Sequence, residues 1–92
     1  MIVEMELIEQ IADEPQGWEL SRVVEFLDEL GRSDHRHLLG GMWRAGAIHF
    51  TKADEGACAE HEVAHWLRGA DTPRWCVHAT DDGVAWAFGR RP

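Results

Sequence analysis

The spacing of the apolar residues changes along the chain, and this change constrains the fold more than any other feature. Before Pro73, apolar side chains recur every three to four residues, which is typical of helices with one buried face. After Pro73 they alternate with polar or small side chains, which indicates β-strands. The pattern therefore predicts an α+β fold that is mainly helical and ends in a β-hairpin. With 92 residues, the chain is expected to form a single domain, residues 1–92.

Glycine and proline residues mark where the helices are expected to end, and Ser33 or Asp34 is expected to cap the third one. In chain order we expect helices over residues 2–13, 19–30 and 35–45, a short strand over 47–51, a helix over 55–68 capped by Asp54, and hairpin strands over 75–80 and 84–88. The side chains expected to point into the core are Val3, Leu7, Ile8 and Ile11, then Leu20, Val23, Val24, Phe26, Leu27 and Leu30, then Leu38, Leu39, Met42 and Ala45, and finally Ala59, Val63, Trp66 and Leu67.

The dipeptide Asp82-Gly83 is the strongest local signal for the hairpin, because Asp-Gly is favoured in tight turns between strands. One face of this hairpin would be aromatic. The other face would carry small side chains such as Cys76, which predicts that something covers it. A helix of this chain or the second subunit of a homodimer would meet that need.

The net charge of −8 lies entirely in residues 1–31, which hold nine acids and one base, Arg22. The rest of the chain has equal numbers of acids and bases and contains all six histidines. An acidic chain argues against non-specific binding of nucleic acid and favours a basic protein partner. We expect Glu25, Asp28 and Glu29, on the outer face of the second helix, to meet such a partner, as in an inhibitor or adaptor.

The apolar runs are too short for a membrane span, and no signal peptide opens the chain. Two cysteines are too few for a disulfide scaffold, so the chain is expected in the reducing cytoplasm.

The stretch from Leu20 to Phe50 resembles a winged helix-turn-helix. A helix ending in Leu30-Gly31 is followed by a short turn, a second helix and an apolar-Gly-apolar entry into a strand. The resemblance implies that residues 35–45 form a recognition helix and residues 74–90 form the wing. It further implies that the outward face of this helix contacts DNA phosphates or an acidic protein surface. This face carries Arg36, His37, Gly40 and Arg44, with Trp43 beside them.

The segment His61-Glu62-Val63-Ala64-His65 is an HExxH sequence and resembles the signature of zincin metallopeptidases. The resemblance implies that His61 and His65 bind zinc and that Glu62 acts as general base on the bound water. Cys58 and Asp71 are further candidate ligands, as are Cys76 and His78. A chain of this composition contains HExxH by chance about 4% of the time. A solvated histidine face, a structural zinc site and a peptidase are therefore three alternatives.

Taken together, these patterns predict a small non-enzymatic binding or regulatory domain that acts through a protein or DNA partner and needs no cofactor. The alternative is a zinc-dependent hydrolase that uses residues 61–65.

Overall fold

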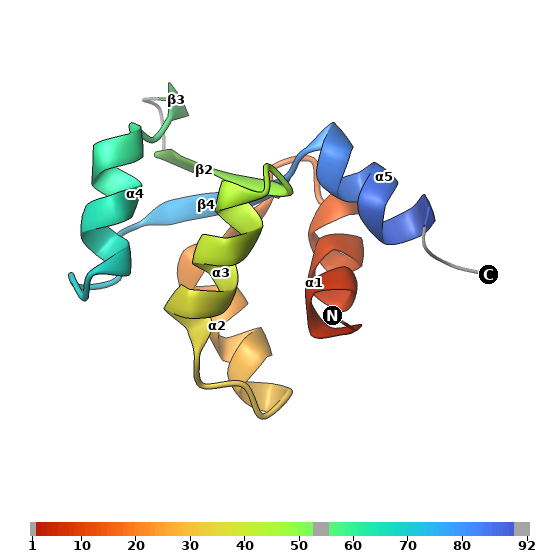
Figure 1. Ribbon diagram of the computed structural model, residues 1–92, viewed down its shortest axis with the longest axis horizontal. Helices are drawn as coiled ribbons and strands as arrows, with labels where there is room; N and C mark the ends of the chain where they lie inside the picture. Colours follow the sequence, from red (N-terminus) through yellow and green to blue (C-terminus); the bar gives the residue numbers. More distant parts are fainter. Residues whose placement is uncertain (1, 53–55, 90–92) are drawn as a thin grey trace.

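A computed structural model describes residues 2–52 and 56–89 of the chain. It is an α+β domain, and its described part contains five helices and one four-stranded antiparallel sheet (Figure 1). In chain order the elements are α1 (Ile2–Ala12), β1 (Trp18–Glu19), α2 (Leu20–Glu29), α3 (His35–Arg44), β2 (Ile48–Lys52), β3 (Gly56–Ala57), α4 (Glu60–Leu67), β4 (Trp75–Ala79) and α5 (Asp81–Gly89). None of the helices in this described part is long and apolar enough to cross a membrane.

The sheet has the strand order β1-β4-β2-β3, so β4 lies between two strands that come much earlier in the chain. Val77 of β4 lies opposite Phe50 of β2 and Trp18 of β1. Because directly opposite residues point to the same face of a sheet, these three buried side chains form the core face. The neighbouring positions, among them Thr51 and Cys76, point to the other face.

Most side chains that the apolar pattern assigns to the core are indeed buried. Leu30, Ala45 and Ala59 are the exceptions, since all three are exposed at the ends of their helices. The remaining expected positions that are buried form one cluster with the sheet, namely Leu7, Ile8, Ile11, Leu20, Val23, Leu27, Leu38, Leu39, Met42, Val63 and Trp66.

Two helix ends confirm the glycine signals. After α2, Gly31 has φ of 78°, and the next N–H, from Arg32, donates to Leu27 O at 2.9 Å. After α3, Gly46 has the same φ, and Ala47 N–H donates to Met42 O at 2.9 Å. Both ends have the hydrogen-bond pattern of a Schellman motif, in which glycine accepts the left-handed conformation at least cost.

The predicted C-terminal hairpin is wrong, because residues 81–89 form helix α5 and β4 pairs with β2 instead. Thr80 explains the difference, since it caps the helix. Gly83 N–H donates to Thr80 Oγ1 and Val84 N–H donates to Thr80 O, both at 2.9 Å. Asp81 and Asp82 are therefore first-turn acids at a helix N-terminus, where the helix dipole favours negative charge.

The fourth helix is shorter than predicted, because it begins at Glu60 and is preceded by strand β3. Glu62 stabilises this start by accepting a hydrogen bond from Ala59 N–H at 3.0 Å. The predicted cap Asp54 lies outside the described residues. Strands β1 and β3 have two residues each, which is too short for a period-two pattern to predict.

Helices α4 and α5 lie at opposite ends of the molecule (Figure 1). Helix α5 packs beside α1, and α4 packs beside α3. One side of α3 is therefore covered by α4, and the other side faces α1 and α5. The candidate site lies on this second side.

Candidate functional site

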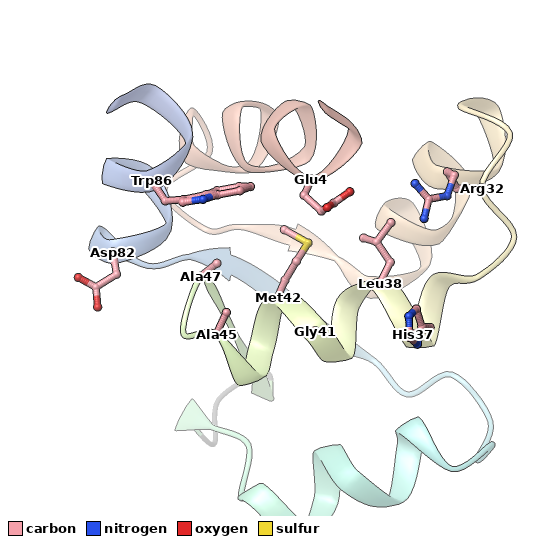
Figure 2. A pocket seen from close by; sticks show the side chains of 10 residues that line it. All are labelled: Glu4, Arg32, His37, Leu38, Gly41, Met42, Ala45, Ala47, Asp82 and Trp86. Carbon is pink, nitrogen blue, oxygen red and sulfur yellow. The ribbon is translucent and has the colours of Figure 1, made fainter. Parts of the chain in front are cut away.

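A groove of about 470 Å³ lies between α1, α3 and α5 (Figure 2). Its lining joins segments from both halves of the chain. The lining residues are Glu4, Arg32, His37, Leu38, Gly41, Met42, Ala45, Ala47, Asp82 and Trp86.

The floor of the groove follows one side of α3. Leu38, Met42 and Ala45 are spaced by four and three residues, so they lie in a row along the helix. Figure 2 shows Leu38 and Met42 pointing from α3 toward α1, and Trp86 reaching in from α5. Beside them, Gly41 is exposed, and a Cβ atom there would meet nothing within 4 Å.

Gly83 allows α5 to form one wall of this groove. It is buried where α5 crosses the end of α3, and a Cβ at this position would collide with the backbone oxygen of Ala47. Thr80, at the start of the helix, also donates a hydrogen bond from Oγ1 to Gly46 O. The α3–β2 turn and the α5 start are thus held together by close backbone contact.

The charged groups of the groove lie above and around its apolar floor. In Figure 2 the Glu4 carboxylate points from α1 toward Met42, and Asp82 lies at the α5 end. Arg32 binds Asp34 through two hydrogen bonds, of 3.0 and 2.8 Å. This contact lowers the pKa of Asp34 to about 2. The positive charge of Arg32 is therefore largely matched before any partner arrives.

The opposite side of α3 is covered by α4, and Arg36 makes the connection. This side chain donates to Trp66 O at 3.0 Å and to Ala70 O at 2.7 Å. Its guanidinium also lies 5.2 Å from the centroid of the Trp66 ring. Close by, Gly40 is buried, and a Cβ there would lie 3.2 Å from Leu67. The structure thus places Arg36 against α4, with two of its N–H donors bound to backbone carbonyls of this chain.

The other predicted contact residues of α3 do not gather on one surface. His37 lies in the groove, whereas Trp43 and Arg44 line a separate concavity with Cys58 and Glu60. The segment 81–89, part of the predicted wing, is helix α5 and contributes to the groove instead.

The acidic residues predicted to bind a partner are all exposed on α2. Asp28 Oδ1 accepts a hydrogen bond from His35 Nε2 at 2.7 Å. Glu25 and Glu29 lie on the same helix, and none of the three lines the groove.

The HExxH residues lie together with Asp71 around a smaller cavity of about 240 Å³. Glu62 is held there by two contacts within the chain. Its Oε2 binds Lys52 Nζ at 2.8 Å, and its Oε1 accepts the Ala59 N–H. The hydrogen bond from Lys52 is the main cause that lowers the pKa of Glu62. This carboxylate therefore stabilises the start of α4 and ties it to β2.

The proposed ligands of this motif are not brought to one point. Cys58 precedes α4 and lines the concavity beside Trp43, whereas His61 and His65 face the cavity that contains Asp71. Within residues 2–52 and 56–89, no three His, Cys, Asp or Glu side chains are grouped to hold a metal ion.

Two further histidines meet on the face of the sheet opposite the core. His49 and His78 lie opposite each other on β2 and β4, with stacked rings 4.9 Å apart. His78 Nε2 is also 2.9 Å from Thr51 Oγ1. Burial, and secondarily the charge of His49, lowers the pKa of His78. Cys76, the other candidate ligand on this face, lies opposite Thr51.

Sequence reasoning missed most of the groove. It correctly assigned Leu38 and Met42 to the core, but it also placed the exposed Ala45 there and did not single out Glu4 or the α5 residues. The one available signal was Thr80-Asp81-Asp82, which is a helix start as well as a turn. Even if residues 81–89 had been predicted as a helix, the sequence would not have shown that this helix packs near α3.

In comparisons with protein-family models, curated proteins and solved structures, nothing matches this chain. Its function is therefore argued from the site alone.

Proposed function

We propose that the chain is a non-enzymatic binding domain that takes a segment of a partner protein into the groove between α1, α3 and α5. The observation that carries this proposal is the apolar floor along the side of α3 that α4 leaves open. A groove of about 470 Å³ is within the range of binding sites, roughly 300 to 1,000 Å³. Its lining combines apolar side chains with a few charged groups, as sites that orient a ligand do.

A protein partner fits this arrangement better than DNA. The three helices followed by the antiparallel pair β2 and β4 resemble a winged helix-turn-helix, although α4 lies between the two strands. However, Arg36 donates hydrogen bonds to Trp66 O and Ala70 O, and the net charge of the chain is −8. DNA affinity depends on several Lys and Arg side chains that neutralise phosphates. The winged-helix-like framework is therefore proposed to serve protein recognition.

The contacts of Glu62 favour a binding domain over a zinc hydrolase. A general base must accept a proton from water, and this task requires a pKa near the working pH. The hydrogen bond from Lys52 shifts the pKa of Glu62 in the opposite direction. The same carboxylate also caps α4, so its geometry is explained by folding.

The proposal is tested by selecting binders from a library of random peptides displayed against the wild-type domain. The diagnostic variant is Gly41→Leu, which places a side chain in the groove at an exposed helical position with open space around it. Ser21→Leu, on the exposed face of α2, is the matched control. We expect selected peptides to bind wild type and Ser21→Leu and to lose most of their affinity for Gly41→Leu.

Chemical shift mapping with the same peptides provides the second readout. The affected amides should lie in α1, α3 and α5. Peptides that bind Gly41→Leu as tightly as wild type, or that shift residues around His61 and His65, would contradict the proposal.

A further inference from the structure

We infer that the segment bound in the groove is a basic amphipathic helix. This inference rests on the proposed function and adds the conformation and the charge of the partner. It is carried by the shape of the groove floor and by the excess of carboxylates around it.

The shape of the floor favours a helical occupant. Leu38 and Ala45 are seven residues apart on α3, which corresponds to about 10.5 Å along the helix axis. A docked helix presents apolar side chains at positions i, i+3 or i+4, and i+7 over the same length. An added strand would instead need an open sheet edge, and the groove is walled mainly by helices.

Small residues at the floor would allow the partner backbone to approach closely. Gly41 has no side chain, and Ala45 and Ala47 lie farther along the groove. Packed helices come within 8 to 10 Å of each other, roughly, when the side chains at the contact are small enough. Leu38 and Met42, each 6% exposed, would then form the floor under the apolar side chains of the partner, with Trp86 closing the α5 side.

The charges around the floor indicate a basic partner. Arg32 is the one Arg or Lys among the lining residues, and it is bound to Asp34. The charge of Glu4 also acts on Arg32, and Glu4 and Asp82 together leave the lining with more carboxylates than cations. The acids of α1 and α2 extend this negative field beyond the groove, since residues 1–31 carry all of the net charge. A helix with Lys or Arg flanking its apolar stripe complements this arrangement.

The test uses synthetic peptides of about 18 residues, long enough to form a helix on binding. Both peptides share one apolar stripe of Leu at helical spacing. The first has Lys on both sides of the stripe, and the second has Gln at the same positions. Affinity for the full domain is measured by fluorescence anisotropy at low and high salt, and helicity is measured by circular dichroism.

Two pairs of variants localise the charge effect. Glu4→Gln and Asp82→Asn change groove carboxylates, whereas Glu6→Gln and Asp81→Asn are matched controls on the same helices outside the lining. We expect the Lys peptide to bind as a helix, and to bind more weakly at high salt. We expect each groove variant to reduce its affinity about fivefold, and the controls to leave it unchanged.

The outcomes separate this inference from the proposed function. Equal binding of the Lys and Gln peptides, with loss of both in Gly41→Leu, would overturn the basic partner and leave the groove as the binding site. A bound peptide without helical signal would overturn the helical occupant. Binding of the Lys peptide that is unaffected by Gly41→Leu, or no binding of either peptide, would overturn the inference and the groove together.

Discussion

Two adjacent glycines of α3 face opposite surroundings. Gly40 is buried against Leu67 of α4, whereas Gly41 is exposed above the groove. On the covered side, Arg36 donates to Trp66 O in the last turn of α4 and to Ala70 O just after this helix. On the open side, the neighbouring helices α1 and α5 leave apolar side chains of α3 within a cavity.

The two sides of α3 thus contribute to the structure in different ways. On the covered side, the charged Arg36 side chain ties α3 to the last turn of α4 and to the residues that follow it. On the open side the small residues Gly41 and Ala45 are exposed, whereas Leu38 and Met42 beneath them are almost completely buried. We therefore expect the same substitution to change the stability of the domain differently on the two sides of α3.

The largest loss of stability is expected from a substitution in α5, which forms one wall of the groove. Gly83→Ala should destabilise the domain by about 3 kcal/mol, because the added Cβ collides with backbone that cannot move aside easily. Urea unfolding measures this loss. Gly89→Ala is the control in the same helix, where a Cβ meets nothing within 4 Å. Similar stability of Gly83→Ala and Gly89→Ala would show that α5 does not rest on Ala47 as described.

A second experiment breaks the covered side. Arg36→Ala should destabilise the domain by about 2 kcal/mol, since it removes charged hydrogen bonds to Trp66 O and Ala70 O. Amide hydrogen exchange should accelerate first in α4. Arg44→Ala, at an exposed position of the same helix, should change stability by less than about 0.5 kcal/mol. Unchanged exchange in α4 would mean that Arg36 does not hold this helix.

The glycine pair itself sharpens the comparison. Gly41→Ala should stabilise the domain by about 0.5 to 1 kcal/mol, because alanine loses less backbone entropy in a helix and has open space here. Gly40→Ala should gain less or lose stability, since its Cβ would lie 3.2 Å from Leu67. Thermal melts of both variants provide the measurement. An equal gain in both would indicate that α4 does not pack tightly on α3.

The smallest expected effect concerns pH. The folded pKa of Glu62 is below its ordinary value of 4.5, because the ionised form binds Lys52. Its stabilising effect is therefore present above pH 4.5 and is lost as the pH falls through the lower folded pKa. Glu62→Gln should show a weaker loss of stability over that acid range than wild type or Glu60→Gln. Identical acid unfolding curves for wild type and Glu62→Gln would contradict the ion pair.

The apolar period correctly predicted which sides of α1 to α4 are buried over most of their length. The same reasoning was wrong for residues 84–88, because Val84, Trp86 and Phe88 alternate as in a strand although they belong to α5. Alternation over so few residues does not distinguish the two structures. The hydrogen bond from Gly83 N–H to Thr80 Oγ1 caps the N-terminus of α5 and so stabilises the helix.

The helices and their ends follow from the sequence, because they form through interactions between residues that are close along the chain. Helix hydrogen bonds join residues four apart, and Gly31 and Gly46 end α2 and α3 through contacts within one turn. These features follow from local conformational preference and from burial of one face. They needed no knowledge of the rest of the molecule.

Which side of α3 lines the groove depends on tertiary contacts. These contacts are the hydrogen bond from Arg36 to Trp66 O, thirty residues away, and the close approach of Gly83 to the Ala47 backbone. It also made Glu62 a partner of Lys52. Contacts between distant segments depend on the packing of the whole chain, and a period or a short motif contains no information about which segments will meet.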